Sequence, residues 1–327
     1  MLPSNAITVT PIAFESLGVR SMCTFIETPD MKLLIDPGVS LGPRFGLMPH
    51  PSEYKARAER RAEIARMAQI SDLLVITHWH YDHYTPTFHD EIWNGSSLQA
   101  AEEIFGDKVV YAKDVRGQIN PSQRRRGWLF KKTAGRFIRR LESADGNSIV
   151  FGKTRVAFSN PVFHGENNST LGWVIMVTIS HDDASITYAS DVQGPMVDDT
   201  TKMILGEDPQ VLVTSGPPTY LKDYKVTESS LRTALSSIME MALEVPTIIL
   251  EHHLLRDKDW REFTKPAFIN AKRRHNKILT AAEFLGVEEK LLEAHREELY
   301  EKDPPSAEFL KWTKMSGARR ENIAPPI

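Results

Sequence analysis

The strongest indication of the fold is the stretch Leu73-Leu-Val-Ile-Thr-His-Trp-His-Tyr-Asp-His83. Its last six residues hold four strong metal-binding side chains, and the apolar run before them is rich in branched side chains, which predicts a short buried β-strand. If the strand extends through its last residues, His78 and His80 point to one side, because alternate residues of a strand share a face. Asp82 and His83 would then follow in a turn and approach from another direction. This arrangement suits two neighbouring metal ions better than one tetrahedral site.

Length and composition are those of an ordinary globular protein. The chain has 327 residues, a size that large α/β folds reach as one unit, with 25% charged and 41% hydrophobic residues. The single cysteine, Cys23, excludes an intramolecular disulfide and fits a reducing compartment. No basic start followed by an apolar block opens the chain, and no apolar run approaches the ~20 residues that a membrane span needs. We therefore expect a cytoplasmic protein without a membrane partner; a homo-oligomer stays open.

The predicted elements begin as hairpins and continue as alternating strands and helices. Strands are expected at 7–14, 23–27, 32–35, 73–77, 108–112, 148–152, 155–159, 173–180, 185–190, 211–214 and 247–251, and helices at 52–69 and 228–243. Beyond Asp257 the chain is predicted to be mostly helical. Two sheets covered by helices fit this order better than a doubly wound nucleotide fold, since no glycine-rich phosphate loop of the dinucleotide or P-loop type is present.

Further candidate ligands stand where predicted strands end. His164 follows Pro161-Val-Phe, Asp191 follows the strand at 185–190, and a His252-His253 pair follows the strand at 247–251. Polar side chains at the carboxyl ends of sheet strands converge on one crevice. Taken singly, a histidine is more often a packed or surface residue and a strand-end aspartate more often a turn former. The order of these residues behind the opening motif is what favours a shared site.

This order resembles that of the metallo-β-lactamase fold superfamily, in which His-x-His-x-Asp-His after a hydrophobic strand precedes a separate histidine, a strand-end aspartate and a final strand-end histidine. The resemblance covers roughly residues 6–256. The segments Glu15–Arg20, Leu34–Val39 and His252–Asp257 are further similar to an archaeal branch described only as predicted metal-dependent hydrolases. The resemblance implies an αββα four-layer sandwich at 1–256, with two mixed β-sheets flanked by helices. A helical C-terminal extension at 257–327 would pack on the same domain.

Carried over by position, the resemblance implies two metal sites that share a bridging carboxylate. The ligands would be His78, His80 and His164 for the first ion, Asp82, His83 and one of His252 and His253 for the second, with Asp191 as the bridge. His252 is favoured because it follows the strand as the last ligand does in related phosphodiesterases, and His253 would then lie behind it or face the substrate. Asp36 matches an early aspartate that orients the motif loop without binding metal, and such partners fix the geometry of ligands.

The donor set indicates the chemistry. Imidazole and carboxylate ligands without a thiolate suit zinc, iron or manganese, of which zinc is favoured. Two cations ~4 Å apart lower the pKa of a shared water and hold hydroxide at neutral pH, so a hydrolase that uses this hydroxide is predicted. Asp82 or Asp191 would orient the water or relay its proton as the catalytic carboxylate. A structural site is disfavoured, because structural zinc more often uses cysteines in a closed four-ligand set.

A basic segment at 108–140 bears on the substrate. It carries eleven cations against a single acid, Asp114, so its net charge is +10 and that of the remainder is -13, the total being -3. Aromatic residues are interleaved, which suits a phosphate backbone and stacked bases. As an insertion before His164, the segment would overhang the site. The candidate substrate-binding residues are Arg124, Arg125, Arg126, Lys131 and Lys132. The alternative is a solvated helix face, or a patch that pairs with the acidic remainder.

These observations favour a phosphodiesterase or nuclease acting on a phosphate-containing substrate, with RNA or DNA as candidates. Hydrolysis of an ester, a lactone or a thioester stays open, because the same hydroxide attacks a carbonyl carbon. The remaining alternative is a non-enzymatic polyanion-binding protein with a structural metal site. The intact ligand set argues against it, since loss of function commonly erodes ligands first.

Overall fold

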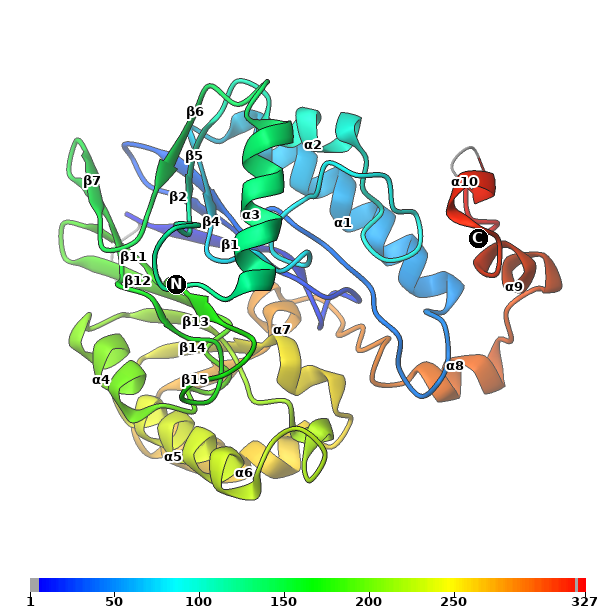
Figure 1. Cartoon of the computed structure of the whole chain (residues 1–327). Coiled ribbons are helices and arrows are strands. Elements are labelled where there is room, and N and C mark those ends of the chain that lie inside the picture. The colour runs from blue at the N-terminus through cyan, green and yellow to red at the C-terminus, as the bar shows by residue number, and fades with distance from the viewer. Residues whose placement is uncertain (1–5, 321–322) are drawn as a thin grey trace.

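Two mixed β-sheets lie face to face in the computed structural model of the chain, which describes residues 6–320 and 323–327 (Figure 1). The first sheet contains, in spatial order, β1 (Thr8–Phe14), β2 (Met22–Glu27), β3 (Lys32–Ile35), β4 (Leu73–Ile76), β5 (Val109–Ala112) and β6 (Arg140–Ser143). The second contains β15 (Lys277–Leu279), β14 (Thr247–Glu251), β13 (Val211–Ser215), β12 (Ala184–Ser190), β11 (Val177–His181), β8 (Thr154–Phe158) and β7 (Ser148–Phe151). A separate short pair joins β9 (Val162–Phe163) to β10 (Trp173–Val174).

Each sheet is antiparallel at one side and parallel at the other. β1, β2 and β3 pair antiparallel, whereas β3, β4, β5 and β6 run parallel. In the second sheet β7, β8, β11 and β12 pair antiparallel, and β12, β13, β14 and β15 run parallel. The parallel strands end at the same edge of their sheet, which is where polar residues can converge.

Helices cover the outer faces of both sheets (Figure 1). The α-helices are α1 (Pro51–Ile70), α2 (Leu98–Phe105), α3 (Pro121–Ala134), α4 (Asp198–Gly206), α5 (Glu228–Glu244), α6 (Trp260–Arg273), α7 (Ala281–Leu285), α8 (Arg296–Lys302), α9 (Ala307–Thr313) and α10 (Gly317–Arg320). Two 3₁₀ turns are η1 (Thr219–Leu221) and η2 (His252–Arg256). Apolar residues of α1, α2 and α3 pack on the first sheet, and those of α4, α5 and α6 pack on the second.

The central strand β4 shows why the layers form. All four of its residues are buried, and they alternate between two cores. Leu73 and Val75 belong to the cluster between the sheets, whereas Leu74 and Ile76 belong to the cluster under α1. A strand buried on both faces needs a continuous apolar run, which explains the unbroken Leu-Leu-Val-Ile sequence. The predicted αββα sandwich is therefore confirmed.

Three local expectations change in the structure. β4 ends at Ile76, one residue before the expected end, so His78 and His80 lie in a loop. They still belong to one group of candidate ligands, but strand alternation is not the cause. The segment 108–140 supplies β5, α3 and the first residue of β6, which makes it part of the first sheet. Trp173 and Val174 pair with β9, so the second hairpin begins only at Val177.

The C-terminal segment is mostly helical but is also built into the core. Within 257–327, β15 extends the second sheet by pairing with β14, and α6 packs on that sheet. A three-residue strand is too short to give a recognisable alternation, so its absence from the prediction is expected. Further along, Phe309 and Trp312 of α9 pack edge-to-face against Tyr54 of α1. Over the described residues no helix has the length and apolar character needed to cross a membrane.

Candidate metal centre

The loop that follows β4 is held at both ends by one carboxylate. Asp36 follows β3, the parallel neighbour of β4, and adopts φ 51°. Its Oδ1 accepts from the Thr77 amide at 2.7 Å, and its Oδ2 accepts from the Thr77 hydroxyl at 2.6 Å. The same Oδ2 accepts from Nδ1 of His83 at 2.8 Å and from the Tyr188 hydroxyl at 2.9 Å. Asp36 therefore ties the first and last residues of the loop to the sheet and turns Nε2 of His83 inward.

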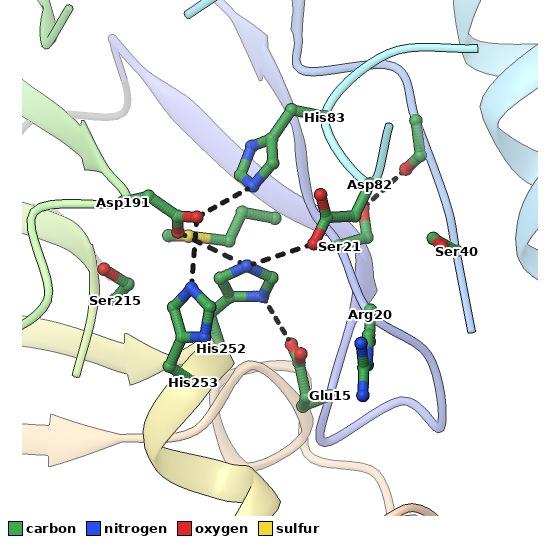
Figure 2. Close-up of polar contacts among 12 residues, drawn as sticks. Glu15, Arg20, Ser21, Ser40, Asp82, His83, Asp191, Ser215, His252 and His253 are labelled. Atoms are coloured by element: carbon green, nitrogen blue, oxygen red, sulfur yellow. Dashed lines mark hydrogen bonds and ion pairs between the residues drawn. The ribbon is translucent and has the colours of Figure 1, made fainter. Parts of the chain in front are cut away.

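Histidines that follow three separate strands, β4, β9 and β14, converge on Asp191, which is buried after β12. Its Oδ2 lies 3.7 Å from Nε2 of His78, 3.3 Å from Nε2 of His83, 3.0 Å from Nε2 of His164 and 3.3 Å from Nε2 of His253. Its Oδ1 lies 3.3 Å from Nε2 of His252. Figure 2 shows His83, His252 and His253 around this carboxylate. The preceding residue, Ser190, adopts φ 56°, which bends the chain out of the strand and into the site.

Four overlapping groups of described side chains have the spacing of metal ligands, and one of them consists of Asp36, His78 and His83. The donor atoms of His78, His80, His164 and Asp191 lie within 4.8 Å of one another, and so do those of Asp82, His83 and His252. These two groups contain the residues that the resemblance assigns to the two sites, except that Asp191, the expected bridge, is grouped with the first set and not with Asp82 and His83. Asp191, His252 and His253 form a further group with the same spacing. The structure thus brings the candidates together, and their binding of ions stays a prediction.

The donor atoms in the centre fit a cation. Nε2 of His78, His83 and His164 and Oδ1 of Asp191 are buried and have no hydrogen-bond partner among the described residues. A buried polar atom without a partner costs about 1–3 kcal/mol, and several such atoms aimed at one place multiply that cost. A divalent cation would satisfy lone pairs on nitrogen and oxygen at once. The unpartnered atoms therefore favour occupation by metal.

Protonation in the chain alone also fits ligand roles. Burial, followed by the neighbouring imidazoles, lowers the pKa of His78 well below its usual range and that of His80 to about 3. Burial opposes ionisation of Asp191, but the surrounding histidines hold its pKa well below the ordinary value. The pKa of Asp82 is lowered in the same way, mainly by His83 and His252. Neutral imidazole and ionised carboxylate are the forms that bind metals.

His83 and His252 behave differently because each lies close to more than one carboxylate. Burial disfavours the charged form of His83, but Asp191 and Asp36 raise its pKa well above the usual value. Asp191 and Glu15 overcome the same burial effect at His252 and raise its pKa to about 9. In the chain alone, protons on these rings balance the carboxylates. A cation would take over that balancing charge.

Glu15 and Arg256 are site residues to which the sequence assigned no role. Oε2 of Glu15, at the end of β1, lies 2.9 Å from Nδ1 of His252, which adopts φ 60° at the start of η2 (Figure 2). Oε1 of Glu15 accepts from Nε and Nη2 of Arg256 at 2.9 and 2.7 Å. Arg256 Nη1 lies 3.1 Å from Nδ1 of His253, whose pKa is lowered by burial and then by this guanidinium. A charged residue directly after an apolar strand was the available signal for Glu15.

Of the five candidate substrate-binding cations, Arg126 is the one with a hydrogen bond or a cation–π contact to the loop 77–83, here called the motif loop. Arg126 of α3 donates from Nη1 to the carbonyl of Trp79 at 3.2 Å, and its guanidinium lies over the Tyr81 ring at 4.5 Å. Gly127 allows this close approach, because a Cβ there would lie 2.5 Å from the Trp79 ring. The other four candidates are exposed on α3: Arg124, Arg125, Lys131 and Lys132.

Comparison with curated proteins gives matches along most of the chain, whereas no model of a protein family matches it. The UPF0282 protein of Methanopyrus kandleri is 41% identical over 292 residues, which cover 89% of this chain and 98% of that protein. The UPF0282 protein of Korarchaeum cryptofilum is 39% identical, covering 93% and 98%. That of Thermococcus gammatolerans is 42% identical, covering 90% and 95%.

Among solved structures the similarities are weaker. The metallo-β-lactamase fold protein YhfI from Bacillus subtilis aligns with a TM-score of 0.46 and 13% identity, over 84% of this chain and 96% of that one. A diphosphatase of the PhnP family aligns with a TM-score of 0.43 and 15% identity, over 75% and 86%. The two mixed sheets with helices on their outer faces agree with the four-layer arrangement that the sequence resemblance implies.

Proposed function

The chain belongs to the archaeal UPF0282 family, and we propose that it is a metal-dependent hydrolase whose substrate is a phosphodiester, with RNA or DNA as the source. The observation that carries the metal dependence is the set of unpartnered buried atoms at the centre of the site. Nε2 of His78, His83 and His164 and Oδ1 of Asp191 converge there, and none of these atoms makes a hydrogen bond of normal geometry with another described residue.

The donor set supports two divalent cations, with zinc favoured over manganese and iron. It combines imidazole nitrogens and carboxylate oxygens, and the chain's single cysteine is buried elsewhere in the fold. When bound, two such cations lower the pKa of a shared water and neutralise negative charge on a phosphoryl oxygen. The chain's own part is to place these donors, to hold Asp191 between the two groups and to exclude bulk water from them.

Asp82 is the carboxylate placed to assist a water nucleophile. Its side chain is 18% exposed, whereas that of Asp191 is 1% exposed, so a water entering the site reaches Asp82 first. Oδ2 of Asp82 lies 3.5 Å from Nε2 of His252 (Figure 2). Since its pKa is held low, Asp82 stays ionised at neutral pH and can accept a hydrogen bond from that water. Asp191 is the alternative acceptor, through its unpartnered Oδ1.

A phosphodiester is favoured over a carbonyl ester by the position of Arg126. Its guanidinium contacts Trp79 and Tyr81 of the loop that carries the candidate ligands, and the same helix α3 bears the four exposed cations. One hydrogen bond to Trp79 leaves most of its five N–H groups available, and a guanidinium matches the geometry of phosphate oxygens. The net charge of +10 on 108–140 would attract a longer polyanion toward the same side.

The test combines metal analysis with hydrolysis. We expect purified protein to hold about two zinc ions per chain when loaded with Zn²⁺, and to hydrolyse bis(p-nitrophenyl) phosphate. A chelator should abolish this hydrolysis, and Asp82→Ala should reduce it by at least about 100-fold, the scale of a lost general base. Asp199→Ala, which removes an exposed carboxylate from α4, serves as the matched control and should leave the rate unchanged.

Two outcomes would contradict the proposal. If the zinc-loaded protein cleaves p-nitrophenyl acetate or a lactone but no phosphodiester, the phosphodiester proposal is rejected in favour of a carbonyl substrate. If the protein stays free of metal after loading and still binds RNA, the hydrolase proposal is rejected in favour of a non-enzymatic polyanion-binding protein.

A further inference from the structure

The Nδ1 atoms of the adjacent histidines His252 and His253 have different partners, a carboxylate for His252 and a guanidinium for His253. Nδ1 of His252 lies 2.9 Å from a carboxylate oxygen of Glu15, whereas Nδ1 of His253 lies 3.1 Å from Nη1 of Arg256. Both rings turn Nε2 toward Asp191, at 3.3 Å from Oδ1 and Oδ2 respectively. Nη2 of Arg256 also lies 3.4 Å from each ring nitrogen of His252, but the nearer partner of Nδ1 of His252 is the Glu15 carboxylate. The two rings therefore look alike from the centre of the site and differ in the nearest partner of Nδ1.

This difference in the partner of Nδ1 fixes where each ring keeps its proton. An ionised carboxylate only accepts hydrogen bonds, so the proton that His252 retains on binding an ion is on Nδ1, and its Nε2 offers a lone pair. A guanidinium only donates, so Nδ1 of His253 must accept and its proton must be on Nε2. His252 can thus bind a cation through Nε2, whereas His253 presents an N–H group. In the chain alone this N–H group donates to Oδ2 of Asp191 at 3.3 Å, and it becomes available to a substrate oxygen once that carboxylate binds cations.

Arg256 is held firmly enough to impose this choice. It is buried, and Oε1 of Glu15 accepts from both its Nε and its Nη2. The Glu15 carboxylate forms an ion pair with Arg256, and this fixes the direction in which Nη1 of Arg256 donates to Nδ1 of His253. To bind a metal through Nε2 while accepting at Nδ1, His253 would have to lose its last ring proton. A single carboxylate therefore orients one ring directly and the other through Arg256.

The two rings also differ in their exposure to solvent, which again favours His253 as the ring that meets a substrate. The side chain of His253 is 15% exposed, whereas that of His252 is fully buried. Asp82, the carboxylate that a water can reach, is exposed to a similar degree. His253 and Asp82 thus belong to the open side of the centre, where a substrate must enter.

We propose that His253 is a catalytic residue that donates its Nε2–H to a non-bridging phosphoryl oxygen of the substrate, and that it is not a metal ligand. The ring transfers no proton: it stabilises charge that grows on this oxygen as hydroxide forms a bond to phosphorus. The bond from phosphorus to the ester oxygen then breaks, and the leaving alkoxide or phenoxide takes its proton from solvent. Arg256 is the positioning residue that keeps the proton on Nε2. This inference rests on the proposed function for its substrate, but its assignment of the ring proton can be tested without any activity.

The first experiment measures zinc content and kinetics on bis(p-nitrophenyl) phosphate for His252→Ala, His253→Ala and His253→Gln. We expect His253→Ala to retain the zinc content of the unmodified protein and to lose about 100-fold in kcat, the scale for one oxyanion donor. His253→Gln should recover part of that loss, because its amide can donate. His252→Ala should lose zinc. A drop in zinc content for His253→Ala or for His253→Gln, or an unchanged kcat for His253→Ala, would overturn the proposal.

The second experiment reads the ring proton directly. In the zinc-loaded protein, ¹⁵N NMR of the histidine side chains, assigned by comparison with the two alanine variants, should show a proton on Nε2 of His253 and on Nδ1 of His252. A proton on Nδ1 of His253 would refute the inference even in an active enzyme. Conversely, an inactive protein with the expected protons would reject the phosphodiester function and leave the His253 assignment intact.

Arg256→Met tests the positioning step. We expect it to keep zinc and to lose kcat as His253→Ala does, with the double variant no worse than either single one. Additive losses would show that Arg256 acts separately from His253 and would contradict the positioning role.

Discussion

Oδ2 of Asp36 accepts a hydrogen bond from Nδ1 of His83 across 2.8 Å, between two fully buried residues. The carboxylate thereby directs Nε2 of His83 toward Asp191. Partners of this kind fix the ring orientation and the tautomer of a ligating histidine. The side chain of Asp36, which follows β3, thus connects the first sheet to the loop 77–83.

Replacing this carboxylate should weaken metal binding. Asp36→Asn keeps the volume but offers an amide in place of an anion, so we expect zinc affinity to fall about 10–100-fold while the fold is retained. Titration with Zn²⁺ against a competing chelator measures this. Asp72→Asn is the control, because Asp72 stands at the opposite end of β4 and its Oδ2 accepts only from the Lys32 amide. Equal affinities for the two variants would refute the role of Asp36.

Arg126 should contribute to substrate binding more than its neighbours on α3. Arg126→Ala removes a guanidinium beside the motif loop, whereas Arg125→Ala removes one from the exposed face. A charge-assisted hydrogen bond is worth about 1.5 kcal/mol, so kcat/KM for bis(p-nitrophenyl) phosphate should fall about tenfold for Arg126→Ala. The Arg125→Ala protein should match the unmodified enzyme. If both variants were equally active, Arg126 would have no part in the site.

The exposed cations of α3 should govern affinity for a longer polyanion. Neutralising Arg124, Arg125, Lys131 and Lys132 together should weaken binding of single-stranded RNA. The slope of log K against log salt should fall by about 3, because each phosphate contact to a single strand contributes about 0.7. Neutralising Lys265, Lys272, Arg273 and Arg274, which are exposed on or beside α6, is the matched control. Equal slopes for the two variants would favour the alternative that the cations of α3 form a solvated helix face with no part in RNA binding.

Residues close in sequence were the ones whose arrangement could be predicted. The motif at 78–83 and the strand-end positions of His164 and Asp191 follow from local apolar runs and the residues after them. The layers could be predicted for the same reason, since the long strands alternate with recognisable helices.

Contacts between distant residues could not be predicted. Glu15 and His252 are 237 residues apart, and no local pattern pairs them. The same holds for Arg256, whose role depends on the fold bringing β1 to η2. The basic segment was misleading in another way: its charges suggested an insertion, although Val109–Ala112 within it forms a strand between β4 and β6.

A last prediction concerns acid stability and the C-terminal segment. Glu293 forms a two-bond ion pair with Arg20, at 2.6 Å for each contact. Burial tends to raise the pKa of Glu293, but Arg20, helped by Arg256 and Arg296, lowers it from 4.5 to about 2. A carboxyl whose pKa is lower in the folded state stabilises that state above its unfolded pKa. The contribution is lost as pH falls from about 4.5 toward 2.

We therefore expect Glu293→Gln to lower the free energy of unfolding at pH 7 by roughly 3 kcal/mol, and the difference from the unmodified protein to shrink below pH 4.5. Urea unfolding at several pH values between 7 and 3 measures it. Glu288→Gln, which changes an exposed carboxylate nearby in sequence, should give no difference at any pH. A Glu293→Gln deficit that stays constant down to pH 3 would mean that lost packing, and not the buried ion pair with Arg20, accounts for the destabilisation.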